Sequence, residues 1–251
     1  IGALAQKGKR GFRSGARAAI SRPSVTITTR QQERTCAPFE FIRSAAPRFS
    51  NSTRWSSPRP ARVRRRFAIG VNYLDTYFRS GLYPSALPMI PGSEGSGEVT
   101  AVGPGVEGFK VGDRVAYVTT PGSYAEARNV DVKHLVHLPD SVSHEQAAAM
   151  LLKGFTAQYL LRQTYRVQPG DAILVHAAAG GVGQILCQWG KHLGATVIAT
   201  VGSPAKAEIA RACGADHVFG YEDFVAKVAE VTGGAKCAVV YDGVGKATFP
   251  A

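Results

Sequence analysis

The sequence contains few cysteines and places them far apart. Its 251 residues include four, namely Cys36, Cys187, Cys213 and Cys237, and no two of them form the C-x-x-C pair of structural zinc sites and redox motifs. This spacing argues against a disulfide framework as well, because such frameworks need several cysteines in a short secreted chain. No stretch reaches the roughly 18 consecutive apolar residues of a membrane span. The composition predicts a soluble protein in a reducing compartment, which we expect to be the cytoplasm.

Acidic residues are scarce at the start of the chain. Residues 1–66 hold 16 of the 30 Lys and Arg but only Glu33 and Glu40 of the 18 acidic residues, so this segment carries a charge of +14 and the remainder −2. It shows no sustained period of 2 or 3.6, and we predict a disordered or non-native basic segment there. Three interpretations stay open: sequence foreign to the protein, a transit peptide that would direct it to the mitochondrion, or an arm that binds nucleic acid. Because the chain begins with Ile1 and not Met, we also expect a fragment or a conceptual translation.

Turn signals mark residues 67–145 as a first domain. Pro-Gly and Ser-Gly pairs recur at short intervals, at residues 80–81, 91–92, 104–105 and 121–122, and β-prone runs lie between them at 98–102 and 114–118. This pattern predicts a compact β-rich unit that is mostly strand up to about residue 140. Ser143 then predicts a helix start as N-cap, with Gln146 as its capping-box partner and helix formers up to Leu161.

Strands and helices alternate in residues 146–251, which we take as a second domain. The expected strands are 172–176, 196–201, 217–221 and 237–241, and the expected helices are 181–193, 204–213 and 222–231. Such alternation predicts a doubly wound parallel sheet. A complete sheet of this kind has about six strands, so we expect a truncated sheet with an exposed edge at 237–241. We accordingly expect the 251-residue chain to be a poor enzyme by itself.

The spacing Ala178-x-Gly180-x-x-Gly183 is a dinucleotide-binding fingerprint with alanine in the first position. It lies between an apolar strand and an apolar-periodic helix, which is the context that the fingerprint requires. Glycine lets the main chain approach a pyrophosphate, and the free amides of a helix start favour its negative charge. These residues therefore predict a bound dinucleotide.

The end of the second predicted strand indicates which dinucleotide binds. That strand runs into Gly202-Ser203-Pro204 and carries no acid, whereas pockets that prefer NAD place a carboxylate there to bind the ribose 2′-hydroxyl. Ser203 and Lys206 can instead donate hydrogen bonds to a 2′-phosphate. The sequence therefore predicts NADPH as the cofactor.

Longer stretches carry a resemblance to a known family. Residues 68–84, the run PGSEGSGEVTAVGPGVEGFKVGDRV at 91–115, HAAAGGVG at 176–183 and YDGVG at 241–245 closely resemble the zinc-independent quinone oxidoreductases of the medium-chain dehydrogenase/reductase superfamily. The resemblance covers residues 68–251. It implies an α/β chain in which a partial GroES-like β-rich catalytic domain is followed by a truncated Rossmann sheet, and a homodimer for the intact family. It also implies NADPH-dependent, metal-free hydride transfer to a quinone or a related α,β-unsaturated carbonyl compound. The alternative is a non-catalytic member that binds nucleotide or RNA or serves as a structural protein.

The resemblance assigns roles to individual residues. The catalytic candidates lie on residues 72–83, which would line the cleft and stabilise negative charge on the substrate oxygen: Asn72, Tyr77 and Tyr83. The cofactor-binding candidates are Asn72, Thr156, Ala178, Gly180, Gly181, Val182, Gly183, Ser203, Lys206, Tyr221, Gly243 and Val244. Simpler interpretations remain open for some of them. The tyrosines would then be half-buried packing residues, Thr156 would bond to its own helical turn, and Lys206 would be solvated.

Metal ligands are not expected. Zinc-dependent relatives place a Cys and a His ahead of a Glu, but the matching positions are Asn72 and Ser93, and only Glu94 is kept. Amide and hydroxyl side chains are poor zinc ligands, so we predict no metal site. The pair His134 and His137 lacks a third ligand in register and is interpreted as a solvated strand pair. His176 precedes the glycines on a buried strand and is interpreted as a core histidine.

Overall fold

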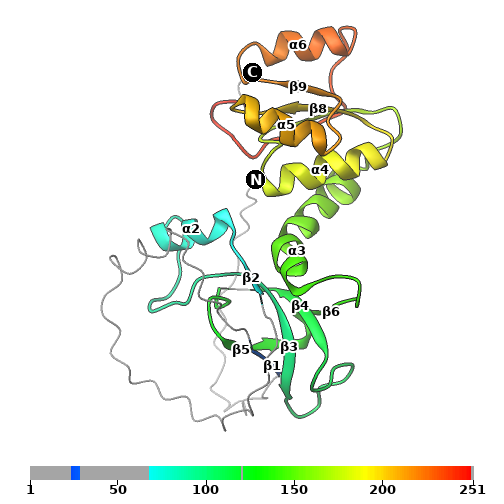
Figure 1. Ribbon diagram of the computed structural model, residues 1–251. Helices are drawn as coiled ribbons and strands as arrows, with labels where there is room; N and C mark the ends of the chain where they lie inside the picture. Colours follow the sequence, from blue (N-terminus) through cyan, green and yellow to red (C-terminus); the bar gives the residue numbers. More distant parts are fainter. Residues whose placement is uncertain (1–23, 29–67, 120, 250–251) are drawn as a thin grey trace, which may run out of the picture.

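The computed structural model describes residues 24–28, 68–119 and 121–249. Figure 1 shows two bodies connected by the long helix α3: a β-rich unit, and a unit in which helices surround a parallel sheet. Among the described residues, the β-rich unit holds a six-stranded antiparallel sheet of order β5-β1-β3-β4-β6, with β2 also pairing with β3. Its strands are β1 (Ser24–Thr28), β2 (Ala68–Gly70), β3 (Glu94–Val102), β4 (Arg114–Val118), β5 (Ala127–Asp131) and β6 (Leu135–His137).

The β-rich sheet has its own small core. Val99 of β3 and the alternate residues Val115 and Tyr117 of β4 are at most 1% exposed, and Val130 and Leu135 from the neighbouring strands pack against them. Alternation of this kind places one side of each strand in the core. The unit therefore has a hydrophobic centre separate from that of the parallel sheet.

Strand β1 corrects the expectation for the first 66 residues. We predicted no strand there, but Ser24–Thr28 pairs antiparallel with both β3 and β5, with Val25 opposite Val102 on one side and Val130 on the other. Its sequence SVTIT alternates β-branched apolar residues with hydroxyl residues, which is a strand pattern; the surrounding Arg-rich composition concealed this short run. The three interpretations of the basic segment otherwise fall on residues 1–23 and 29–66, which lie outside the described residues.

Helix α2 (Tyr73–Ser80) is a second correction, because residues 67–140 were predicted to be mostly strand. Asn72 is its N-cap residue, and the Asp75 carboxylate accepts a 2.9 Å hydrogen bond from the Asn72 backbone N–H. At the other end, Gly81 adopts φ 78°, a left-handed conformation that favours glycine, and its N–H bonds to Phe78. These are the start and stop signals of a short helix. A further short 3₁₀ turn, η1, spans Val132–His134.

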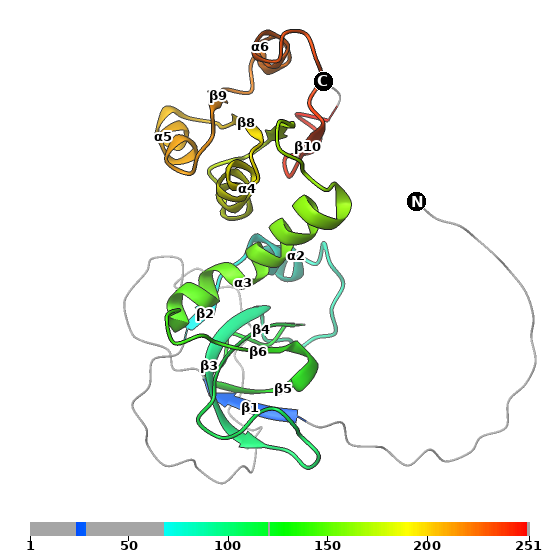
Figure 2. The same ribbon diagram turned by 90° about the vertical axis from the view of Figure 1, so that its right-hand side faces the viewer.

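Helix α3 (His144–Tyr159) links the two units. The predicted capping box is confirmed: Ser143 Oγ accepts from the Gln146 N–H at 3.1 Å, and Gln146 Oε1 accepts from the Ser143 N–H at 2.9 Å. The helix continues into a π-helical turn, η2 (Leu160–Thr164). It packs on β3 at one end and on α4 at the other, as Figure 2 shows. The predicted domain boundary between residues 145 and 146 falls in the first turn of α3. The division of the chain at this point stays a prediction.

The parallel sheet has the strand order β10-β7-β8-β9 among the described residues. Its strands are β7 (Ala172–Val175), β8 (Thr196–Thr200), β9 (His217–Phe219) and β10 (Val239–Tyr241), and its helices are α4 (Gly181–His192), α5 (Pro204–Ala212) and α6 (Phe224–Val231). Every predicted strand and helix of this region is present, with ends that differ by a few residues.

Helices cover both faces of the parallel sheet. Ile173, Val175 and Val197 pack with residues of α3, α4 and α5, whereas Leu174 and Ile198 pack with Phe224 of α6 on the opposite face. Alternate strand residues point to opposite faces, so this division shows the doubly wound arrangement directly. Strand β10 pairs with β7 and lies at one edge of the sheet.

Candidate dinucleotide and substrate site

The fingerprint residues form a tight turn between β7 and α4. Gly180 is the N-cap of α4, and no side chain caps this helix start, so the first amides of the helix point outward for an anion. A Cβ at Gly183 would lie 2.6 Å from the Ala177 carbonyl oxygen and 2.7 Å from Ala178 Cα. Only glycine fits there, because the neighbouring atoms are backbone. Ala177 itself has φ 51°, an uncommon conformation for a residue with a side chain.

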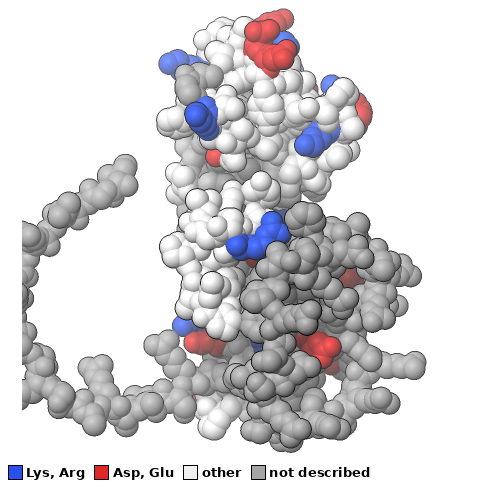
Figure 3. All heavy atoms as spheres, turned by 90° about the vertical axis from the view of Figure 1, so that its left-hand side faces the viewer, with Lys and Arg blue, Asp and Glu red and all other residues white. Residues whose placement is uncertain are grey.

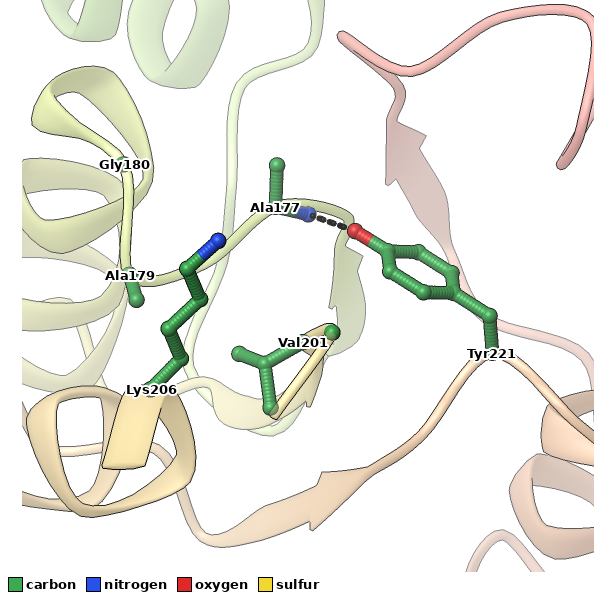
Figure 4. A pocket seen from close by; sticks show the side chains of 7 residues that line it. Ala177, Ala179, Gly180, Val201, Lys206 and Tyr221 are labelled. Atoms are coloured by element: carbon green, nitrogen blue, oxygen red, sulfur yellow. Dashed lines mark hydrogen bonds between the residues drawn. The ribbon is translucent and has the colours of Figure 1, made fainter. Parts of the chain in front are cut away.

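A pocket of about 210 Å³ opens beside this turn, lined by Ala177, Ala179, Gly180, Val201, Gly202, Lys206 and Tyr221. Figure 4 shows Lys206 rising from α5 and Tyr221 reaching in from the segment after β9, with both polar ends directed at the turn. The Tyr221 hydroxyl accepts a 3.1 Å hydrogen bond from the Ala177 N–H, so its own proton remains available to a ligand. The seven lining residues include no acid.

The sequence explains how Lys206 reaches the pocket. Ser203 caps α5 by accepting from the Lys206 N–H at 3.4 Å, and Pro204 occupies the first turn. Pro at this position and Ser at the cap are strong helix-start signals. No salt bridge is recorded for Lys206 within the described residues. Its side chain lines the pocket beside the glycine turn (Figure 4).

His176, as predicted, is a buried histidine of the core. It is 5% exposed, and its Nδ1 lies 2.6 Å from Thr200 Oγ1. Phe224 packs edge-on against its ring at 5.0 Å. Burial lowers the pKa of His176. The side chain is thus held in the core beneath the glycine turn.

A cluster of polar side chains forms a second part of the site, on the β-rich side. Asn72 donates through Nδ2 to Glu94 Oε2 at 2.7 Å and accepts through Oδ1 from Lys153 Nζ at 2.7 Å. Lys153 also forms an ion pair with Glu94 at 3.3 Å. The other oxygen of Glu94 accepts from the Leu152 N–H at 2.8 Å, and the carboxylate is fully buried. Each of these three side chains is therefore held by the other two.

The roles of Lys153 and Glu94 were not predicted from the sequence, although a signal exists for the lysine. Lys153 is the one charged residue between Glu145 and Arg162, within the otherwise mostly apolar α3. Charged residues seldom occupy a buried helix face unless they are paired. That rule, applied to residues 147–161, would have raised Lys153 as a candidate.

A hydrogen-bonded extension of this cluster runs to α2 and the loop after β4. The Tyr124 hydroxyl donates to Asp75 Oδ2 at 2.9 Å, and the same oxygen accepts from the Asn72 N–H. Burial, together with the Asp75 carboxylate, raises the pKa of Tyr124. Three buried side-chain oxygens have no hydrogen-bond partner among the described residues, namely Asp75 Oδ1, Ser93 Oγ and the Tyr117 hydroxyl. Asn72 is thus fixed from both its backbone and its side chain.

The predicted catalytic tyrosines come together in an aromatic cluster. The ring centroids of Tyr77 and Tyr83 lie 5.3 Å apart, and Tyr73 and Phe78 pack against them at 5.4 and 5.7 Å respectively. Tyr83 is 45% exposed and Tyr73 77%. The cluster therefore presents an apolar, partly exposed surface beside Asn72 at the start of α2.

Two other predicted cofactor residues form local hydrogen bonds, and a third is exposed. Thr156 donates to the Leu152 carbonyl at 2.9 Å, which is the simpler of its two interpretations. The Val244 N–H donates to Asp242 Oδ1 at 2.7 Å, so it is already satisfied within the turn after β10. Gly243 in the same turn is exposed, and a Cβ there would meet nothing within 4 Å. Desolvation would raise the pKa of Asp242, but bonds from Gly245, Thr248 and Val244 hold it below its ordinary value.

Neither a metal-ligand cluster nor a membrane-spanning helix is found among the described residues. No group of three or more His, Cys, Asp and Glu side chains in these residues could hold a metal ion. On the face drawn in Figure 3, their charged side chains lie in small scattered groups, several of which contain both signs. No helix of the same residues is long and apolar enough to cross a membrane.

Comparison with known proteins defines the class. Residues 61–140 match the family model of the alcohol dehydrogenase GroES-like domain, and residues 181–251 match that of zinc-binding dehydrogenases. The chain belongs to the medium-chain dehydrogenase/reductase superfamily, with a GroES-like unit followed by a Rossmann-like sheet, as predicted.

Similar proteins include quinone oxidoreductases and a related reductase. The chain is 58% identical over 196 residues to a quinone oxidoreductase of Pseudomonas aeruginosa, covering 76% of this chain and 60% of that protein. It is 47% identical to a 2-haloacrylate reductase of a Burkholderia species, with 77% and 61% covered. The crystal structure of the Escherichia coli quinone oxidoreductase complexed with NADPH matches with a TM-score of 0.71 at 50% identity, covering 72% of this chain and 57% of that one. The chain thus spans about 60% of the length of these relatives.

Proposed function

We propose that the chain binds NADPH and reduces quinones or related α,β-unsaturated carbonyl compounds by hydride transfer, without a metal ion. The pocket at the end of β8 carries this proposal, because it offers an ammonium and a phenol to a phosphate and no carboxylate that would repel one. The names of the relatives support the reaction class: quinone oxidoreductase and 2-haloacrylate reductase both denote reduction of an activated unsaturated compound.

The described residues fit such a dinucleotide. Lys206 and Tyr221 would hold the 2′-phosphate, and the uncapped start of α4 at Gly180 and Gly181 would hold the pyrophosphate. When bound, the nicotinamide supplies the hydride. The protein contributes the surface against which a substrate would bind. The aromatic cluster around Tyr77 and Tyr83 offers an apolar surface to the flat ring of a quinone.

Asn72 is the best placed donor to a substrate oxygen. One of its two amide hydrogens is committed to Glu94, which leaves the second for a ligand. Because Oδ1 is fixed by Lys153, the amide cannot turn over without losing that bond. A preorganised donor of this kind stabilises an oxygen on which negative charge develops.

The test is cofactor selectivity, measured by fluorescence titration. Lys206→Ala removes a charge-assisted contact worth about 1.5 to 3 kcal/mol, so the Kd of NADPH should rise on the order of tenfold or more while that of NADH stays nearly unchanged. Lys133→Ala is the matched control, because Lys133 is an exposed lysine paired with Asp131 outside this site. If wild type binds NADH as well as NADPH, or if Lys206→Ala weakens both equally, the proposal is wrong.

A further inference from the structure

Lys153 is the cation of a charge cluster that faces the glycine turn. Its side chain is 19% exposed, whereas its counter-ion Glu94 is 0% exposed and is also held by Asn72 and by the Leu152 backbone. The ammonium is therefore the more accessible end of the pair. A carboxylate so deeply buried requires a cation nearby, because an unpaired buried charge is strongly destabilising.

The stem of Lys153 lies directly against the start of α4. A Cβ added to Gly181 would be 2.8 Å from Lys153 Cδ and 3.0 Å from Cε. Lys153 does not line the pocket of Lys206 and Tyr221, so the two lysines approach the glycine turn at different points. If the phosphate end of a dinucleotide occupies that pocket and the pyrophosphate lies at Gly180 and Gly181, the remaining half would extend toward Lys153 and Asn72.

We propose that the Lys153–Glu94 pair sets the preference of the site for the oxidation state of the cofactor, with the Lys153 ammonium favouring the reduced form. The reduced nicotinamide ring is neutral and the oxidised ring carries a positive charge, while the two forms are otherwise alike in charge. A fixed ammonium near the ring therefore disfavours the oxidised form by simple repulsion. The consequence would be preferential loading of the hydride donor and easier release of the oxidised product. This inference rests on the proposed function.

The experiment compares the Kd of NADP⁺ with that of NADPH in four chains. Lys153→Met leaves the carboxylate alone and should lower the ratio of the NADP⁺ Kd to the NADPH Kd on the order of tenfold. Glu94→Gln leaves the ammonium alone and should raise the ratio by several fold. The double variant removes both charges and should lower the ratio below that of wild type, but less than Lys153→Met does, because the carboxylate that attracts the oxidised ring is also gone. Altered packing alone would not shift the Kd ratios of the two single variants in opposite directions.

Controls separate this effect from other losses. Lys206→Met should weaken both cofactor forms and leave their ratio unchanged, because both carry the same 2′-phosphate. Thermal melting establishes that each variant is folded; if Lys153→Met is not, the ratio for Glu94→Gln decides. A ratio that stays within twofold of wild type in the folded single variants overturns the inference but not the proposed function. A wild-type chain that binds neither form overturns both.

Discussion

Three helical glycines provide a graded test of the packing, because each meets a different neighbour. Replacing glycine by alanine within a helix gains about 0.5 to 1 kcal/mol where there is room. At Gly154 of α3, a Cβ would meet only Met150 Cε at 3.8 Å, so Gly154→Ala should stabilise the chain by about that amount. At Gly190 of α4, the Cβ would lie 2.6 Å from Ile173 Cδ1, the far end of a flexible side chain.

Gly183→Ala is the severe case, because its close neighbours are backbone atoms at 2.6 and 2.7 Å. Overpacking costs about 1 to 3 kcal/mol, and the helix gain of about 0.5 to 1 kcal/mol offsets part of it, so the predicted net loss is up to about 2.5 kcal/mol. The free energies of unfolding can be measured by urea titration, with the fluorescence of Trp189 in α4 as the probe. The expected order of stability is Gly154→Ala, then Gly190→Ala, then Gly183→Ala. A Gly183→Ala variant as stable as Gly154→Ala would refute the packing described for the glycine turn.

Two further predictions concern metal and pH. Asn72 Oδ1 is already engaged by the Lys153 ammonium, so quinone reduction should persist after treatment with a chelator; zinc found at one equivalent per chain, and removed with loss of activity, would contradict this. Burial lowers the pKa of His176, so the unfolded chain binds a proton there at a pH where the folded chain does not, and the free energy of unfolding should fall as pH drops below about 6.5. Between pH 7.5 and 5.5, the free energy of unfolding of His176→Asn should fall less than that of wild type in urea titrations. An equal fall in the two proteins would show that His176 is not the source of the pH dependence.

The parallel sheet was the most predictable part of the molecule. Its strands are short apolar runs bounded by glycine or proline, and its helices begin at readable caps such as Ser203 with Pro204. These signals are local, so the sequence alone reveals them. The β-rich unit was less predictable, because β1 pairs with residues at least 70 positions away and its five residues are embedded in a basic, turn-prone composition.

Helix α2 was missed for a related reason. Its cap is Asn72 with Asp75, but the glycines and aromatic residues around it are typical of a β-rich region. The helix is only eight residues long, too short to show a full hydrophobic period. The capping signal was present, and the surrounding composition outweighed it.

The polar cluster could not be predicted because it depends on tertiary contacts. Asn72, Glu94 and Lys153 are separated by up to 81 positions and come from the start of α2, from β3 and from α3. Only the packing of α3 across the β-rich sheet brings them together. The sequence showed which side chains were chemically unusual, and the fold decides which of them meet.

The same packing connects the stability of the β-rich unit to the charge at the dinucleotide turn. Glu94 is buried beneath α3 and has Lys153 as its cation, and the absence of a side chain at Gly181 leaves room for the stem of that lysine. A side chain at Gly181 would therefore act at two places: it would obstruct a pyrophosphate at the helix start, and it would force the stem of the lysine that pairs with a buried carboxylate to shift. Glycine at this position thus leaves space both for the Lys153 stem that pairs with Glu94 and for a pyrophosphate at the start of α4. Helix α3, which carries Lys153, connects these two structural requirements.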